Sequence, residues 1–66
     1  MTKEELREER TSRGMTQEQF GQFLADLLGR ARAYSKSEVS VYETGQRPVP
    51  ARIALALLED RMKGDT

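Results

Sequence analysis

A capping-box motif, Ser or Thr followed three residues later by Glu or Gln, stands at three candidate helix starts in this 66-residue chain and strongly constrains its fold. In a capping box the Ser or Thr side chain accepts a hydrogen bond from the later backbone N–H, and the Glu or Gln side chain accepts one in return. The three pairs are Thr2 with Glu5, Thr16 with Gln19, and Ser35 with Glu38. Apolar residues flank each pair at the positions that brace a helix start, so we predict three helices beginning just after these Thr and Ser residues.

Glycines and prolines indicate where the helices end. Gly14, Gly29 and Gly45 follow the three predicted helices, and glycine suits the left-handed conformation that commonly closes a helix. Pro48 and Pro50 then break the chain, and Pro50 suits the first turn of a fourth helix that runs to about residue 62. No stretch alternates in the manner of a strand, and residues 64–66 are expected to fray. The sequence therefore predicts a single all-α domain over residues 1–66.

The second predicted helix carries an apolar stripe with one glycine beside it. The stripe consists of Phe20, Phe23, Leu24, Leu27 and Leu28. Gly21 is unfavourable inside a helix by about 1 kcal/mol relative to alanine. We expect it to be there because another helix approaches closely and leaves no room for a side chain.

The residue inventory excludes most enzymatic and metal chemistry. There are no cysteines and no histidines, so disulfides, the usual zinc ligands and His-activated nucleophiles are absent. The carboxylates do not cluster with ligand-like spacing, and we predict a non-enzyme with no catalytic residue, metal or cofactor. No stretch approaches the roughly 20 apolar residues of a membrane span, and the charged N-terminus is unlike a signal peptide. A cytoplasmic location without membrane contact is expected.

Charge is segregated along the chain although 11 basic residues balance 11 acidic ones. Residues 30–52 hold five cations and two anions, a local net charge of +3. The cations are Arg30, Arg32, Lys36, Arg47 and Arg52. A charge run is commonly only a solvated surface, but local positive potential is also what contact with nucleic acid requires.

The fourth predicted helix is apolar over a wider arc than one buried face needs. We predict that Leu55, Leu58 and Met62 on this arc form a homodimer interface, because so short a chain folds alone only marginally. The alternative is that one helix is buried on two sides within a monomer.

Two segments of the chain resemble the Xre/Cro-cI (lambda-repressor-like) helix-turn-helix family. Residues 6–21 carry the pattern LxxxRxxxGMTQEQFG, and residues 35–50 carry SxxxVSxYExGxRPxP. The resemblance implies a compact domain of four to five helices that binds operator DNA as a homodimer, usually to repress transcription. A chain of 66 residues leaves no room for a sensor domain, so no small-molecule effector is expected.

The recognition helix of such a domain enters the major groove of double-stranded DNA with its N-terminal residues at base edges. The candidate base-reading residues here are Lys36, Ser37, Ser40, Val41 and Thr44. Lys36 could donate to guanine or contact a phosphate, and Val41 could contact a thymine methyl group. Val39 and Tyr42 are spaced to point the other way, into the core. Glu38 could accept from cytosine, but its capping box already accounts for it.

The resemblance also implies contacts that hold the domain together and fix it on the DNA backbone. An ion pair between Arg10 and Glu43 would tie the first helix to the recognition helix, with Arg7 as a competing partner for Glu43. The candidate contacts to the DNA backbone are Gln17, Arg30, Arg32, Ser35, Arg47 and Arg52.

The connection between the second and third helices is longer than the family's turn of about four residues. Because Leu27 and Leu28 continue the apolar stripe, we predict that the extra length divides into another helical turn and a longer loop. Arg30 and Arg32 in this loop could grip phosphates, enter a minor groove or remain solvated, and we favour phosphate contact.

Two functions fit the sequence. The first is a sequence-specific repressor that binds a palindromic operator as a homodimer, either phage-borne or acting on its own promoter. The alternative is an antitoxin-like or adaptor module that keeps the same fold and binds a protein through its fourth helix.

Overall fold

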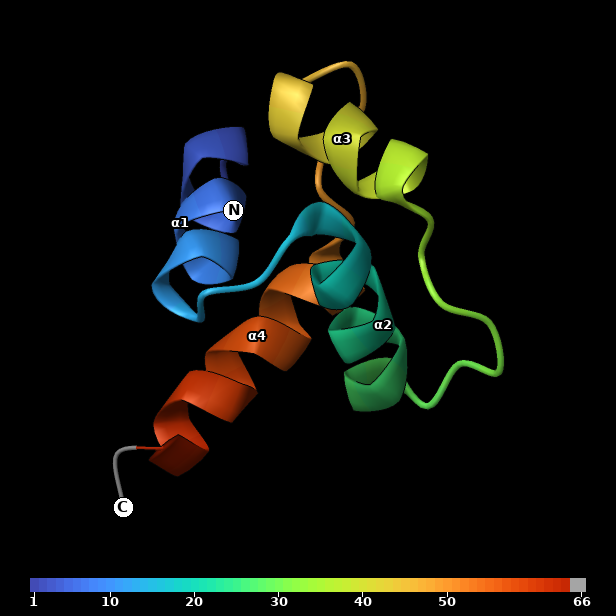
Figure 1. Ribbon diagram of the computed structural model, residues 1–66. Helices are drawn as coiled ribbons and strands as arrows, with labels where there is room; N and C mark the ends of the chain where they lie inside the picture. The colour runs from blue at the N-terminus through green and yellow to red at the C-terminus, as the bar shows by residue number, and fades with distance from the viewer. Residues whose placement is uncertain (65–66) are drawn as a thin grey trace.

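Residues 1–64, the part of the chain that a computed structural model describes, contain four α-helices and no strand (Figure 1). In chain order they are α1 (Lys3–Ser12), α2 (Gln17–Leu28), α3 (Lys36–Thr44) and α4 (Ala51–Gly64). The predicted all-α class is confirmed, and so is the extension of α2 through Leu28. The α2–α3 connection, residues 29–35, is correspondingly long.

The fourth helix differs slightly from its prediction. Pro50 lies one residue before α4, and its carbonyl accepts hydrogen bonds from the backbone N–H groups of Ile53 and Ala54. The helix continues two residues beyond Met62, so Gly64 is helical rather than frayed. Asp65 and Thr66, which were also expected to fray, lie outside the described residues.

The three predicted capping boxes all form, each as a reciprocal pair of hydrogen bonds. The Thr2 N–H donates to the Glu5 carboxylate over 2.8 Å, and the Ser35 N–H donates to Glu38 over 3.0 Å. These bonds from the backbone, with smaller help from the cap side chains, lower the pKa of both carboxyl groups. A lowered pKa in the folded state means that each carboxylate stabilises the fold above the ordinary glutamate pKa. That contribution is lost as the pH falls through the lowered value.

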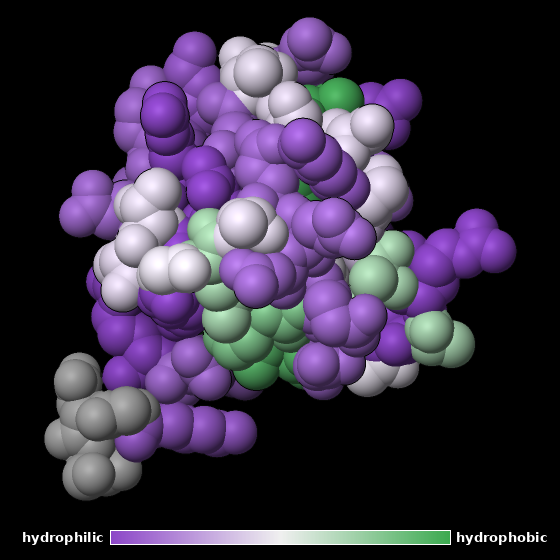
Figure 2. Space-filling model, viewed as in Figure 1, coloured by the Kyte–Doolittle hydropathy of each residue, from purple (hydrophilic) through white to green (hydrophobic). Residues whose placement is uncertain are grey.

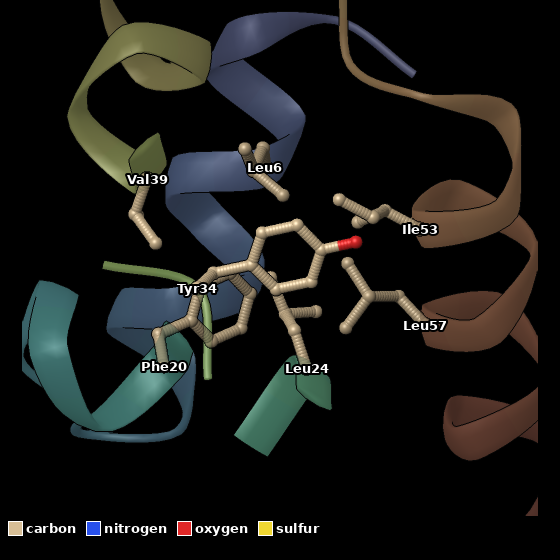
Figure 3. Packing of buried hydrophobic residues seen from close by; sticks show 7 residues of the cluster. All are labelled: Leu6, Phe20, Leu24, Tyr34, Val39, Ile53 and Leu57. Atoms are coloured by element: carbon tan, nitrogen blue, oxygen red, sulfur yellow. The ribbon is translucent and has the colours of Figure 1, made fainter. Parts of the chain in front are cut away.

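The core lies where all four helices meet (Figure 3). Its fully buried large side chains are Leu6, Phe20, Leu24, Val39, Ile53 and Leu57. Tyr34 is 2% exposed, and it joins this cluster from the α2–α3 connection rather than from a helix. The Tyr34 side chain therefore fixes the long connection to the body of the domain.

Outside the core, the side of the molecule seen in Figure 2 is mostly hydrophilic, with an apolar area between α2 and α4.

Gly21 allows the same connection to pass directly over α2. The Tyr34 backbone N–H donates to the Gly21 carbonyl over 3.3 Å. A Cβ atom on Gly21 would lie 2.0 Å from the Tyr34 carbonyl oxygen. The predicted close approach is confirmed, but the expected neighbour was wrong. The backbone of the connection crosses α2 here, and no helix does.

Candidate nucleic-acid interface

The predicted reading face of α3 points away from the core. Val39 is fully buried and Tyr42 is half-buried against the core cluster, which fixes the rotation of the helix. At about 100° per residue, Ser37, Ser40, Val41 and Thr44 fall on the opposite side, and Lys36 lies at its edge, about 60° from Val39. Lys36, Ser37 and Thr44 are exposed, and Ser40 and Val41 are half-buried. The Thr44 hydroxyl donates to the Val41 carbonyl over 3.2 Å, so its proton is already used within the helix.

A hydrogen-bonded ion pair holds α3 against α1 and α2. The Arg10 guanidinium donates from Nε to Glu43 over 2.7 Å and from Nη2 over 3.2 Å, and its Nη1 donates to the Met15 carbonyl. The Gln17 side-chain amide donates to the same Glu43 carboxylate over 3.3 Å. Gln17, which was expected to contact a phosphate, therefore also binds the Glu43 carboxylate of this ion pair. Arg7 is exposed and takes no part in it.

The α2–α3 connection brings two cations close to the start of α3. The Arg30 guanidinium carbon lies 3.9 Å from the ring centroid of Tyr34, a cation–π contact that the sequence did not predict. Arg30 and Arg32 are both exposed, and their charges help to lower the pKa of Glu38 after the larger effect of the Ser35 hydrogen bonds. The connection stands at the right of Figure 1, and hydrophilic side chains project from that side in Figure 2. Positive charge therefore flanks the N-terminus of α3.

The buried Tyr34 hydroxyl has no hydrogen-bond partner within residues 1–64. Because an unsatisfied buried polar group is unfavourable, Tyr34→Phe is expected to raise the free energy of unfolding by about 1 kcal/mol. Urea denaturation measures the change. Tyr42→Phe, at a half-buried position, is the matched control and should be close to neutral. A clear loss of stability in Tyr34→Phe would show that the hydroxyl has a bonded partner in solution.

Two hollows flank the start of α3. The larger, about 750 Å³, lies between residues 16–22, at the start of α2, and residues 33–36, and includes Ser35 and Lys36 in its lining. The smaller, about 240 Å³, is lined by Ser37, Glu38, Val41, Tyr42 and Arg47. Arg47 is thereby brought beside the reading face. Arg52 is exposed in the first turn of α4 and lines neither hollow.

A second cluster of charged side chains, between α1 and α4, was not predicted from the sequence. Glu9 is only 3% exposed and accepts hydrogen bonds from Arg13, over 2.6 Å, and from Arg61. Arg13 also bonds Asp60 over 3.1 Å. The available signal was the position of Glu9 three residues after the core residue Leu6, on the inward face of α1. The cluster joins two helices and does not border α3.

The remaining predictions concern the surface of α4 and the absence of other sites. Leu55, Leu58 and Met62 are 57%, 50% and 62% exposed.

No helix within residues 1–64 is long and apolar enough to cross a membrane. The same described residues contain no group of three or more acidic side chains arranged to hold a metal ion.

Together, α2, the connection and the outward-facing α3 define an all-α DNA-binding domain of the helix-turn-helix class. The profile of a family described as "Helix-turn-helix domain" matches residues 4–59. Because the match covers most of the chain, the protein belongs to the helix-turn-helix domain family, and the predicted resemblance is confirmed at that level. No curated protein and no solved structure gives a significant match.

Proposed function

We propose that this protein is a sequence-specific transcriptional regulator that inserts α3 into the major groove of double-stranded DNA. The observation that carries the proposal is the way in which α3 is packed against the rest of the domain. Val39 is buried and Glu43 is bound to Arg10, so the opposite face, from Ser37 to Thr44, is left outward, with the exposed Lys36 at its edge. A helix held on two sides by the domain presents its free face with little conformational freedom, as reading base edges requires.

Base reading is assigned to four residues on that free face and to Lys36 at its edge. Lys36 and Ser37 lie in the first turn of α3, the part of a recognition helix that reaches base edges. Ser40 and Val41 follow one turn later, with Thr44 at the far end of the same face. Lys36 is the strongest candidate for discrimination, because an ammonium group donates to guanine O6 and N7.

Contacts to the DNA backbone are assigned to groups around that face. Arg30, Arg32 and Arg47 supply positive charge on both flanks of α3, and the exposed Ser35 begins the helix. Gln17 lies in the first turn of α2, where free backbone N–H groups attract phosphate. Arg52 extends the positive surface onto α4. These cations allow a chain with zero net charge to bind a polyanion.

We further propose that the protein acts as a repressor and that two copies pair through the exposed α4 residues Leu55, Leu58 and Met62. Two-fold pairing presents two copies of α3, so the operator should be palindromic or nearly so. In this proposal the concentration of the protein determines how much of the operator is occupied.

Lys36→Ala is expected to weaken binding to a selected operator by about 1–3 kcal/mol and to relax base preference at one position of each half-site. Fluorescence anisotropy with the operator and with single-base variants measures both effects. Lys63→Ala, near the end of α4, removes the same charge as a control and should leave base preference unchanged. If Lys36→Ala weakened binding equally on every DNA sequence, the result would show that Lys36 contacts a phosphate and does not read a base.

The double substitution Arg30→Ala with Arg32→Ala is expected to make the plot of the logarithm of the DNA association constant against log salt concentration less steep. The negative slope should become smaller in magnitude by about 2, because two phosphate contacts are lost. Titrations across a salt series measure the slope. A slope identical to that of the wild type would mean that the connection does not touch DNA.

A further inference from the structure

A groove between α1 and α4, about 420 Å³ in volume, is lined by none of the residues proposed to contact DNA. We call it the α1–α4 groove. One wall carries Glu4, Glu5 and Glu8 from α1, and the other includes Ala54 and Leu58 from α4, with Met1 completing the apolar lining. Figure 1 shows α1 and α4 on the opposite side of the molecule from the α2–α3 connection.

Two of the four exposed large apolar side chains of the described residues line this groove. The four are Met1, Leu55, Leu58 and Met62. Met1 and Leu58 line the groove, and Leu55 and Met62 lie three residues before and four residues after Leu58 on α4. Concentrated apolar exposure in a small protein marks a surface that another molecule covers.

The charge of the groove is acidic and only partly compensated. The carboxylates of Glu4 and Glu8 are exposed and form no ion pair within residues 1–64. Glu5 is bound to its own helix cap, and the positive charges of the N-terminal amino group and Arg61 also help to lower its pKa. Arg61 also lines the groove, but its guanidinium is bound to Glu9. The groove therefore combines an acidic wall on α1 with an apolar wall on α4.

We propose that the α1–α4 groove binds a cationic amphipathic helix of another protein. Apolar side chains of that helix would pack on Ala54 and Leu58, and its lysines or arginines would pair with Glu4 and Glu8. An amphipathic helix in an apolar groove is a recurrent recognition mode, and charge on the rim selects the partner. The inference does not depend on DNA binding.

A second copy of this chain is the poorer occupant of the groove. A two-fold interface brings the same patch of both subunits together. Pairing two copies of the groove would set the glutamates of one copy against those of the other, with Arg61 already engaged. The proposed α4 dimer contact uses Leu55 and Met62 and shares only Leu58 with the groove.

The test uses the full chain and a labelled synthetic peptide of about 18 residues, with leucines at helical spacing and lysines elsewhere. Fluorescence anisotropy should show saturable binding of this peptide and none of a matched peptide with glutamates in place of lysines. Glu4→Gln with Glu8→Gln should weaken binding about tenfold, through the loss of two exposed charge pairs. Glu18→Gln with Asp26→Asn changes the charge of exposed α2 positions equally and should change affinity less than about twofold. Leu58→Lys, at a half-exposed position, should abolish binding while thermal melting remains cooperative.

Three results would overturn the proposal. The first is no saturable binding of the cationic peptide to the wild-type chain. The second is equal weakening by both double variants, which would indicate unspecific attraction between charges. The third is that Glu4→Gln with Glu8→Gln alters the monomer–dimer equilibrium in sedimentation and leaves peptide affinity unchanged, which would make the groove an interface between copies.

Discussion

Gly21→Ala is expected to destabilise the fold by about 2–3 kcal/mol, although alanine favours helices more than glycine does. The new Cβ would lie 2.0 Å from the Tyr34 carbonyl oxygen. That oxygen belongs to backbone and cannot rotate away, so the connection must shift. Tyr34 would then leave its place in the core, and the Gly21–Tyr34 hydrogen bond would break. Urea denaturation followed by circular dichroism gives the change in unfolding free energy.

Gly14→Ala provides the matched control. Gly14 has a φ of 68° and has no atom within 4 Å of an added Cβ. Alanine there meets only backbone strain, with an expected loss of about 1–2 kcal/mol. A Gly21→Ala protein as stable as the wild type would contradict the close packing of the connection on α2.

Glu43→Ala is expected to destabilise the fold by about 3 kcal/mol. The Arg10 and Glu43 side chains are only 15% and 6% exposed, so truncation would leave a largely buried guanidinium without its anion. The Gln17 amide would lose its acceptor as well. Because these bonds join α3 to α1 and α2, DNA affinity should fall together with stability. Denaturation and operator binding by the same protein sample measure both.

Replacing both members of the pair separates the buried charge from the contact itself. Arg10→Met with Glu43→Leu should be less destabilising than Glu43→Ala alone, because no unpaired charge remains in the half-buried site. If the double variant is the less stable protein, the hydrogen bond from Arg10 to the Met15 carbonyl contributes more than the ion pair.

The helix boundaries could be predicted because their signals are local. Thr16 and Gln19 need only their own backbone to form a capping box, and Gly29 closes α2 in the left-handed conformation that its position indicated. Gly21 shows the limit of such signals. A glycine beside an apolar stripe indicates close approach, but its neighbour is Tyr34, 13 residues later, and the path of the connection is not encoded near Gly21.

The long-range contacts of charged side chains were harder to predict. The Arg10–Glu43 pair came from the family resemblance, since nothing near either residue identifies its partner. Glu9 and Arg61 are 52 residues apart and carry no comparable motif, so their ion pair emerges only when α1 and α4 pack together. Arg30 was expected to face DNA, and its stacking on Tyr34 depends on the buried position of that ring.

The most direct test of the DNA-binding proposal is selection from a random pool of DNA duplexes by the purified chain, followed by affinity measurements on the enriched sequence over a range of salt concentrations. We predict a palindromic or near-palindromic consensus, with affinity at least about 1,000-fold above that for scrambled duplex and falling steeply with salt. Failure to enrich any sequence, together with equal affinity for enriched and scrambled duplexes at low salt, would contradict the proposal and leave the protein-interaction module as the better explanation of the fold.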